Sequence, residues 1–239
     1  GVGDTFQDNV INTADRLIEH QLPASVIWTD RPFTSGEKGW GDPGFSDSFP
    51  DPQQMINYLN DKGYEYLLWV TNRCSNTLYD EGEEKGYIFE DHTWPAADIR
   101  RPEVYNWFKD FLDIYVDMGV KGYKIDRGAE GEMPDSVQNE LVYLFAKLTS
   151  EGQKEKNGDD HYIFVRNAYD RSRQYAGVWN GDTYCDSSGL EVSIKNGLRC
   201  GAINMQMYGS DIGGYSKPSL PSKDLLARWF AFGAYCPSV

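Results

Sequence analysis

The stretch Gly122-Tyr123-Lys124-Ile125-Asp126-Arg127-Gly128 is a short apolar run that ends in a carboxylate and opens into a glycine-containing loop. A strand that finishes in this way is an ordinary strand end. It is also the arrangement by which many barrel enzymes present a catalytic group. The rest of the chain decides between the two interpretations, because a working carboxylate needs partners at the ends of neighbouring strands.

Runs of β-type residues alternate with helical patterns from one end of the chain to the other. Short apolar runs predict strands, and apolar residues recurring every three to four positions predict helices. The segments 31–50 and 72–101 are rich in glycine, proline or polar residues and are predicted to be long loops. The predicted strands are 26–30, 66–71, 122–126, 162–166, 177–182 and 203–212. The predicted helices are 10–18, 55–59, 102–115, 137–148, 190–198 and 225–232.

This alternation indicates parallel βα units, in either a barrel or an open doubly wound sheet. Five charged side chains stand at or just past the carboxyl ends of predicted strands. These ends meet at one mouth in a barrel, whereas an open sheet would spread them along a line. We therefore favour the barrel. The five residues are Asp30, Asp126, Arg166, Asp182 and Asp211.

The fold class that we predict is α/β, a (β/α)8 TIM barrel that is incomplete in this chain. The sequence supplies about six strands, fewer than the eight that close such a barrel. Residues 1–239 are expected to form one partial catalytic barrel, with no second domain visible and with the last strand outside the chain.

The composition indicates a globular protein with a neutral partner. The formal net charge is −14, and phosphate binding needs clustered Lys and Arg, so neither nucleic acid nor a membrane is expected as a partner. No apolar run approaches the roughly 20 residues that span a bilayer. The chain is therefore expected to be soluble, whether secreted or cytoplasmic. The four cysteines, Cys74, Cys185, Cys200 and Cys236, are scattered, so no metal site is expected and disulfides are left open. No cofactor is expected, and the oligomeric state is left open.

Asp126 and Asp182 are the best candidates for a catalytic carboxylate pair. Hydrolysis of a glycosidic bond uses two carboxyl groups, and a separation of about 5–5.5 Å gives retention through a covalent intermediate. Lys124 points to the same side of its strand as Asp126, and its ammonium is expected to keep Asp126 ionised, as a nucleophile must be. Asp182 follows Trp179-Asn180-Gly181, and a partly desolvated setting of that kind raises a carboxyl pKa and suits a proton donor.

Other side chains near the strand ends are candidates for holding a sugar. Flat aromatic faces stack on a sugar ring, and buried ligand hydroxyls need paired donors and acceptors. Taken singly, most of them have a plainer interpretation: Asp30 as a helix cap or turn residue, Trp69 and Trp107 as core. The candidates are Trp28, Trp69, Trp179 and Tyr208 for stacking, and Asp30, Arg166 and Asp211 for hydroxyls.

In their order and spacing, five stretches of this sequence resemble motifs of glycoside hydrolase family 31. The members of this family are retaining enzymes that act on α-linked sugars and are built on a (β/α)8 barrel. The nucleophile motif is similar to the family's Lys-x-Asp-x-Gly version. The resemblance implies that Asp126 is the nucleophile and Asp182 the acid/base, and that Asp30, Arg166, Trp179 and Asp211 line the subsite for the non-reducing sugar. The stretches that carry it are 49–59, 122–128, 166 with 179–182, 208–214 and 228–237.

Two departures from the family pattern stand out. Members with the Lys version usually carry Glu where this chain has Ala129, so either Glu130 substitutes or the loop has lost a support. The family's substrate-binding His and its accessory β domains lie outside this sequence.

The function that we expect is a glycoside hydrolase that cleaves terminal α-linked sugars from the non-reducing end with retention, through a glycosyl-aspartate. The Lys-type motif is similar to that of members acting on α-xylosides, sulfoquinovosides and some α-galactosides, and Thr71 stands where many glucosidases have Asp. The expected type is therefore an α-xylosidase, α-glucosidase or α-galactosidase, with Trp69, Thr71 and Lys124 added to the substrate-binding set. A non-catalytic carbohydrate-binding or scaffold relative and an α-galactosidase clan relative are the alternatives.

Overall fold

The computed structural model describes residues 4–90, 93–128, 130–216 and 220–237. Within these ranges the strands form one parallel sheet whose spatial order, β1-β2-β3-β4-β5-β6, is the order of the chain. This is the connectivity of a (β/α)8 barrel, so the prediction of an incomplete barrel is confirmed. The strands are β1 (Val26–Thr29), β2 (Glu65–Val70), β3 (Gly122–Ile125), β4 (Tyr162–Val165), β5 (Gly177–Trp179) and β6 (Tyr208–Gly209).

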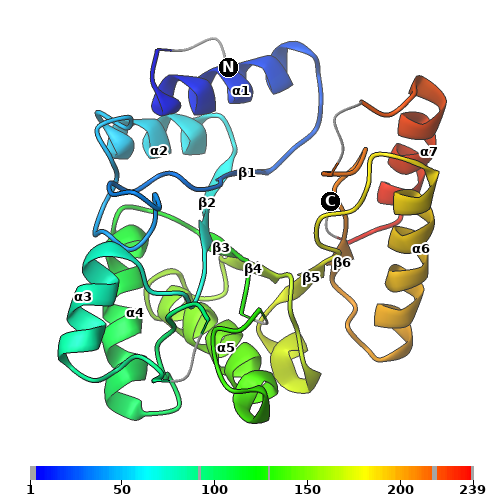
Figure 1. The fold of residues 1–239 in the computed structure, drawn as a ribbon. Helices are drawn as coiled ribbons and strands as arrows, with labels where there is room; N and C mark the ends of the chain where they lie inside the picture. Colours follow the sequence, from blue (N-terminus) through cyan, green and yellow to red (C-terminus); the bar gives the residue numbers. More distant parts are fainter. Residues whose placement is uncertain (1–3, 91–92, 129, 217–219, 238–239) are drawn as a thin grey trace.

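The helices lie along the outer side of the curved sheet, and α1 and α2 stand at the opposite end from α6 and α7 (Figure 1). Local sequence explains where several begin: Asp51 accepts a hydrogen bond from the Gln54 amide and Pro52 takes the first helical position of α2. The helices are α1 (Phe6–Glu19), α2 (Pro52–Asp61), α3 (Asn76–Glu84), α4 (Pro102–Asp117), α5 (Gln138–Asn157), α6 (Ser187–Ala202) and α7 (Lys223–Gly233), with short 3-10 helices η1 (Asp135–Val137) and η2 (Asp170–Gln174).

Alternation along the strands divides the buried side chains between two faces. Tyr66, Leu68, Tyr123 and other residues of the outward face join the main core beneath the helices. A smaller cluster of Leu67, Phe164 and Trp179 lies apart from that core. Because alternate residues point to opposite faces of a sheet, this second cluster marks the inner side of the curved sheet.

Two sequence predictions were wrong at the level of elements. The predicted loop 72–101 contains α3, and the predicted strand 203–212 shrinks to β6 because residues 203–207 form the turn and irregular segment that follow α6. Trp107, expected in the core, is half-buried and packs against the main core between α3 and α4, where its indole N–H donates to Glu81 at 3.3 Å. The apolar pattern of α3 is too sparse to predict a helix, since Leu78 and Gly82 are its buried residues.

All four cysteines are free thiols. In the part of the chain that the structure describes, no helix has both the length and the apolar character needed to cross a membrane. In the same part, no group of three or more His, Cys, Asp or Glu side chains is arranged to hold a metal ion.

Candidate active site

The five charged residues singled out above lie where the sequence predicted, at the carboxyl ends of their strands. Asp126 and Arg166 directly follow β3 and β4, and Asp30 directly follows β1. Asp182 and Asp211 follow β5 and β6 after short turns. The candidate site therefore lies on the face of the barrel at which active sites are built.

The curvature of the sheet brings the ends of distant strands together. Lys124 Nζ, from β3, lies 3.0 Å from Asp30 Oδ2 beyond β1 and 4.4 Å from the centre of the Trp179 ring on β5. In a flat sheet, β1 and β5 would be about 19 Å apart, four strand spacings of about 4.8 Å. One side chain can touch residues of both strands only because the sheet closes around a common space.

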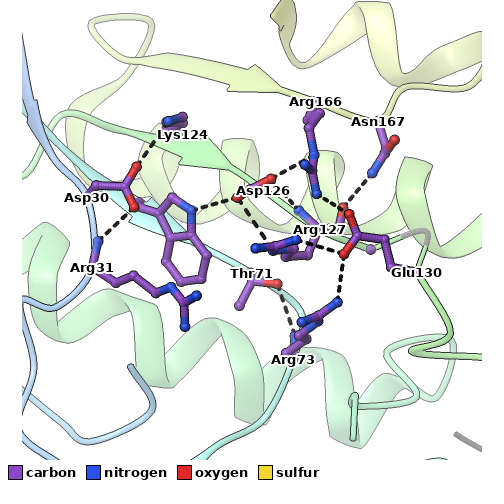
Figure 2. Close-up of polar contacts among 12 residues, drawn as sticks. Asp30, Arg31, Thr71, Arg73, Lys124, Asp126, Arg127, Glu130, Arg166 and Asn167 are labelled. Atoms are coloured by element: carbon purple, nitrogen blue, oxygen red, sulfur yellow. Dashed lines mark hydrogen bonds and ion pairs between the residues drawn. The ribbon is translucent and has the colours of Figure 1, made fainter. Parts of the chain in front are cut away.

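Asp126 is held by three donors around its carboxylate (Figure 2). Its Oδ1 accepts from Arg166 Nε and from the Arg127 backbone N–H, both at 2.8 Å, and its Oδ2 accepts from Trp69 Nε1 at 3.1 Å. The Asp126 side chain keeps 13% of its surface exposed. The three donors fix this carboxylate in place, and its exposed surface leaves it open to a ligand.

Lys124 is not the partner of Asp126 that the sequence predicted. Its side chain is only 7% exposed, and its ammonium is paired with Asp30 between the indoles of Trp28 and Trp179. Arg166 and Arg127 supply the positive charge next to Asp126 instead. Alternation along β3 correctly predicted that Lys124 and Asp126 lie on the same side of the strand. It could not show that Lys124 pairs with Asp30, which follows β1.

Asp211 and Trp179 carry unsatisfied polar atoms within the site. Asp211 Oδ2 and Trp179 Nε1 are both buried, and neither has a hydrogen-bond partner of good geometry. The Trp179 indole nevertheless lies close enough to Asp211 to act on the pKa of its carboxyl in the lowering direction. Burial raises the pKa of the Asp211 carboxyl, Lys124 opposes this shift, and the charges of Asp182 and Asp30 add to it. A buried donor and acceptor left unpaired are a ready place for a ligand hydroxyl.

Asp182 stands in a different environment from the one expected. We predicted a partly desolvated carboxyl, but its side chain is exposed. Its neighbours β5 and β6 are short, and β6 is the last strand of the described sheet, so little protein covers it. Its charge nevertheless acts on both Arg127 and Asp211. That Asp182 faces Asp126 across a sugar stays a prediction.

The remaining predicted residues differ in their surroundings. Trp28 is partly exposed, with Lys124 near its ring. The prediction that Tyr208 stacks on a sugar was wrong, because its ring is buried against α6, where its hydroxyl donates to the Ser193 carbonyl at 2.7 Å. Trp69 is buried and contacts Asp126, so it serves both the core and the site. Thr71 is buried, and its hydroxyl accepts from the Arg73 backbone N–H at 3.3 Å, a contact within its own loop.

The sequence did not predict the network of charged and polar residues around Asp126, although Glu130 was considered as a substitute for the family's Glu. Arg31 lies over the Trp69 ring at 5.5 Å. Glu130 accepts from Arg166. Ala129 lies outside the described residues, so the substitution of Glu130 for the family's Glu stays a prediction. The Arg-x-x-Glu-x-Glu spacing after Asp126 was a signal that could have indicated such a network. Its members are Arg73, Arg127, Glu130, Glu132 and Asn167.

A parallel βα barrel with ordered carboxylates and arginines at its carboxyl-end mouth is the architecture of a barrel enzyme domain. The sequence profile described as "Glycosyl hydrolases family 31 TIM-barrel domain" matches residues 3–239. The chain belongs to glycosyl hydrolase family 31.

Named relatives agree with this assignment. The chain is 27% identical to "Probable glucan 1,3-alpha-glucosidase" of Oryza sativa subsp. japonica, over 97% of this chain and 29% of that protein. It is 24% identical to "Alpha-xylosidase XylQ" of Lactiplantibacillus pentosus, over 96% of this chain and 34% of that protein. The crystal structure of a family 31 α-xylosidase from a soil metagenome, complexed with xylose, shares the fold with a TM-score of 0.86 at 24% identity, over 98% of this chain and 39% of that one. The chain thus spans about a third of these relatives.

Proposed function

We propose that this chain carries the catalytic centre of a retaining α-glycosidase acting on terminal sugars at the non-reducing end. The observation that supports this most is the set of donors that holds the Asp126 carboxylate at the end of β3, in a member of family 31. A nucleophile has to be oriented and reachable, and the Asp126 carboxylate is held by three donors and keeps part of its surface exposed.

In the proposed reaction, Asp126 attacks the anomeric carbon while Asp182 gives its proton to the leaving glycosidic oxygen. The bond to the leaving group breaks as an ester between the sugar and Asp126 forms. Asp182, now a carboxylate, takes a proton from water, and that water displaces Asp126 from the sugar. Two inversions at one carbon leave its configuration unchanged. Arg166 and Trp69 keep the carboxylate in line for both steps.

The substrate class follows from the polar groups around this centre. Asp211 Oδ2 and Trp179 Nε1 offer an acceptor and a donor to one sugar hydroxyl, and the Asp30–Lys124 pair offers a second hydroxyl site. No strongly basic pocket is needed for a neutral sugar. The names of the relatives favour an α-glucoside or an α-xyloside, and an α-galactoside remains within the proposal.

A panel of aryl α-glycosides assayed with the full-length protein tests this function. We expect turnover of at least one α-glucoside, α-xyloside or α-galactoside, and loss of that turnover by several orders of magnitude in Asp126→Ala. Asp61→Ala, at the exposed end of α2, is the matched control and should retain full activity. No turnover with any sugar, together with sugar binding, would favour the non-catalytic relative.

Azide rescue tests the role of Asp126 separately. With the carboxylate removed in Asp126→Gly, azide can enter from the face that the nucleophile occupied, so an activated α-glycoside should give the β-glycosyl azide. An α-glycosyl azide would contradict the assignment of Asp126.

A further inference from the structure

The loop that follows Asp126 is organised by a fully buried carboxylate. The Glu132 side chain has 0% of its surface exposed. Its Oε1 accepts from the Gly128 backbone N–H at 3.2 Å, and its Oε2 accepts from the backbone N–H of Glu130. Glu132 therefore folds back on its own loop and holds the backbone N–H groups of Gly128 and Glu130.

Arg73, from the loop after β2, supplies the counter-charge for this buried acid. Its Nε lies 2.7 Å from Glu132 Oε1 and its Nη2 lies 2.9 Å from Glu130 Oε2. The guanidinium is stacked on Trp94 at 4.7 Å from the ring centre. A planar guanidinium can bridge two carboxylates with fixed directions, which a lysine ammonium cannot do. Arg73 thus sets the positions of both glutamates relative to β2.

Glu130 also contacts the two arginines that touch Asp126, and so connects Arg73 to the residues around the Asp126 carboxylate (Figure 2). Its Oε2 lies 2.8 Å from Arg127 Nη1, and its Oε1 accepts from Arg166 Nη2. Both arginines contact the Asp126 carboxylate. Arg127 has a φ of 68°, a left-handed conformation that is costly for a residue with a side chain and persists where surrounding contacts impose it. Asn167 adds one such contact by donating to the Arg127 carbonyl at 2.7 Å.

We propose that Arg73 and Glu132 are positioning residues for the nucleophile: their buried ion pair holds the loop after Asp126 so that Glu130 orients Arg166 and Arg127 on the Asp126 carboxylate. Neither residue touches the reacting atoms. The role of Asp126 as nucleophile is taken from the function proposed above, whereas the effect on the orientation of its carboxylate does not depend on that function.

Misplacing a catalytic group by about 1 Å can cost on the order of 100-fold in rate. Glu132→Gln keeps the size of the side chain but loses its charge. Arg73→Lys keeps the positive charge but loses the planar guanidinium that bridges Glu132 and Glu130. In the full-length protein we expect each variant to lower kcat about 10- to 100-fold with a smaller change in KM, because neither Arg73 nor Glu132 is among the residues proposed to contact the sugar. Glu103→Gln, which breaks the exposed Arg101–Glu103 pair, should leave kcat unchanged.

A double-mutant cycle separates a shared role from two separate ones. If Arg73 and Glu132 act as a unit, the double variant Arg73→Lys/Glu132→Gln should be no slower than the slower single variant. Effects on kcat that multiply in the double variant, or a Glu132→Gln enzyme within twofold of wild type, would overturn the proposal.

Crystal structures of the wild type and Glu132→Gln provide a readout that needs no activity. We expect the Asp126 carboxylate to turn away from Arg166 Nε in the variant, and an unchanged Arg166–Asp126 contact would overturn the proposal. If neither variant folds, the pair serves the fold and the positioning role is wrong. An inactive wild type, by contrast, would count against the proposed function alone, since this comparison of structures still decides the inference.

Discussion

Asp211 is the acid in the site whose environment most opposes its charge. Its pKa is raised chiefly by burial, with the charges of Asp182 and Asp30 acting in the same direction. One of its oxygens has no hydrogen-bond partner. A residue kept in so unfavourable a setting points to ligand binding, because local cost of this kind is common at functional sites.

The raised pKa of Asp211 predicts how stability depends on pH. Below the ordinary pKa of 3.8 the carboxyl is protonated in both the folded and unfolded states and has no effect. As the pH rises, the unfolded chain ionises first, so the folded state loses stability until the pH exceeds the raised pKa. Asp211→Asn removes this loss, and its melting temperature should exceed that of the wild type by an amount that grows from acid pH to neutral pH.

Thermal unfolding followed between pH 4 and pH 8 measures this difference. For a domain of this size, each kcal/mol corresponds to about 2–4 °C. Asp224→Asn, at an exposed acid paired with Arg228, is the control and should show no such gain. The same Asp211→Asn variant should turn over substrate more slowly. A variant that is less stable at pH 8 than at pH 4, relative to wild type, would contradict this explanation.

At the scale of elements, β3 is the strand on which the site depends, and its first residue leaves no room for a side chain. A Cβ on Gly122 would lie 1.8 Å from the carbonyl oxygen of Tyr162 in β4, which is its register partner. The close approach of β3 to β4 places Asp126 beside Arg166.

Gly122→Ala is therefore expected to destabilise the fold by about 1–3 kcal/mol or more, since the strand backbones have to move apart. Gly201→Ala is the matched control: Gly201 lies in α6 with open space around its Cα, and it should gain about 0.5–1 kcal/mol of stability. Urea unfolding of the two variants measures both values. Equal effects at the two positions would show that the β3–β4 approach is not constrained as described.

Much of the sheet was predictable from sequence because buried strands have short, continuous apolar runs bounded by polar residues. The predicted ends of β1 and β3 place Asp30 and Asp126 correctly for this reason. The helix α3 was missed because its buried side is too small to give a period. The partners of charged residues were harder to predict from sequence. Lys124 pairs with Asp30, 94 positions away in the chain, and a local sequence pattern carries no information about contacts between such distant residues.

At the scale of the whole molecule, one curved sheet gathers groups from both of its edges. The charge of Asp30, beyond β1, acts on Asp211, beyond β6, although these are the first and last strands of the described sheet. The chain is acidic overall, with a net charge of −14, but the residues in contact with Asp126 are arginines and an indole. The fold thus provides a local positive setting for a carboxylate within an acidic protein.

The covalent intermediate is the most direct test of the central claim that Asp126 is the nucleophile. The full-length protein would be incubated with a 5-fluoro glycosyl fluoride of the sugar that the panel identifies, digested, and analysed by peptide mass spectrometry. Our account predicts that the glycosyl group is found on the peptide that contains Asp126 and that Asp126→Ala is not labelled. Labelling of Asp182 instead, or turnover that never labels Asp126, would contradict it.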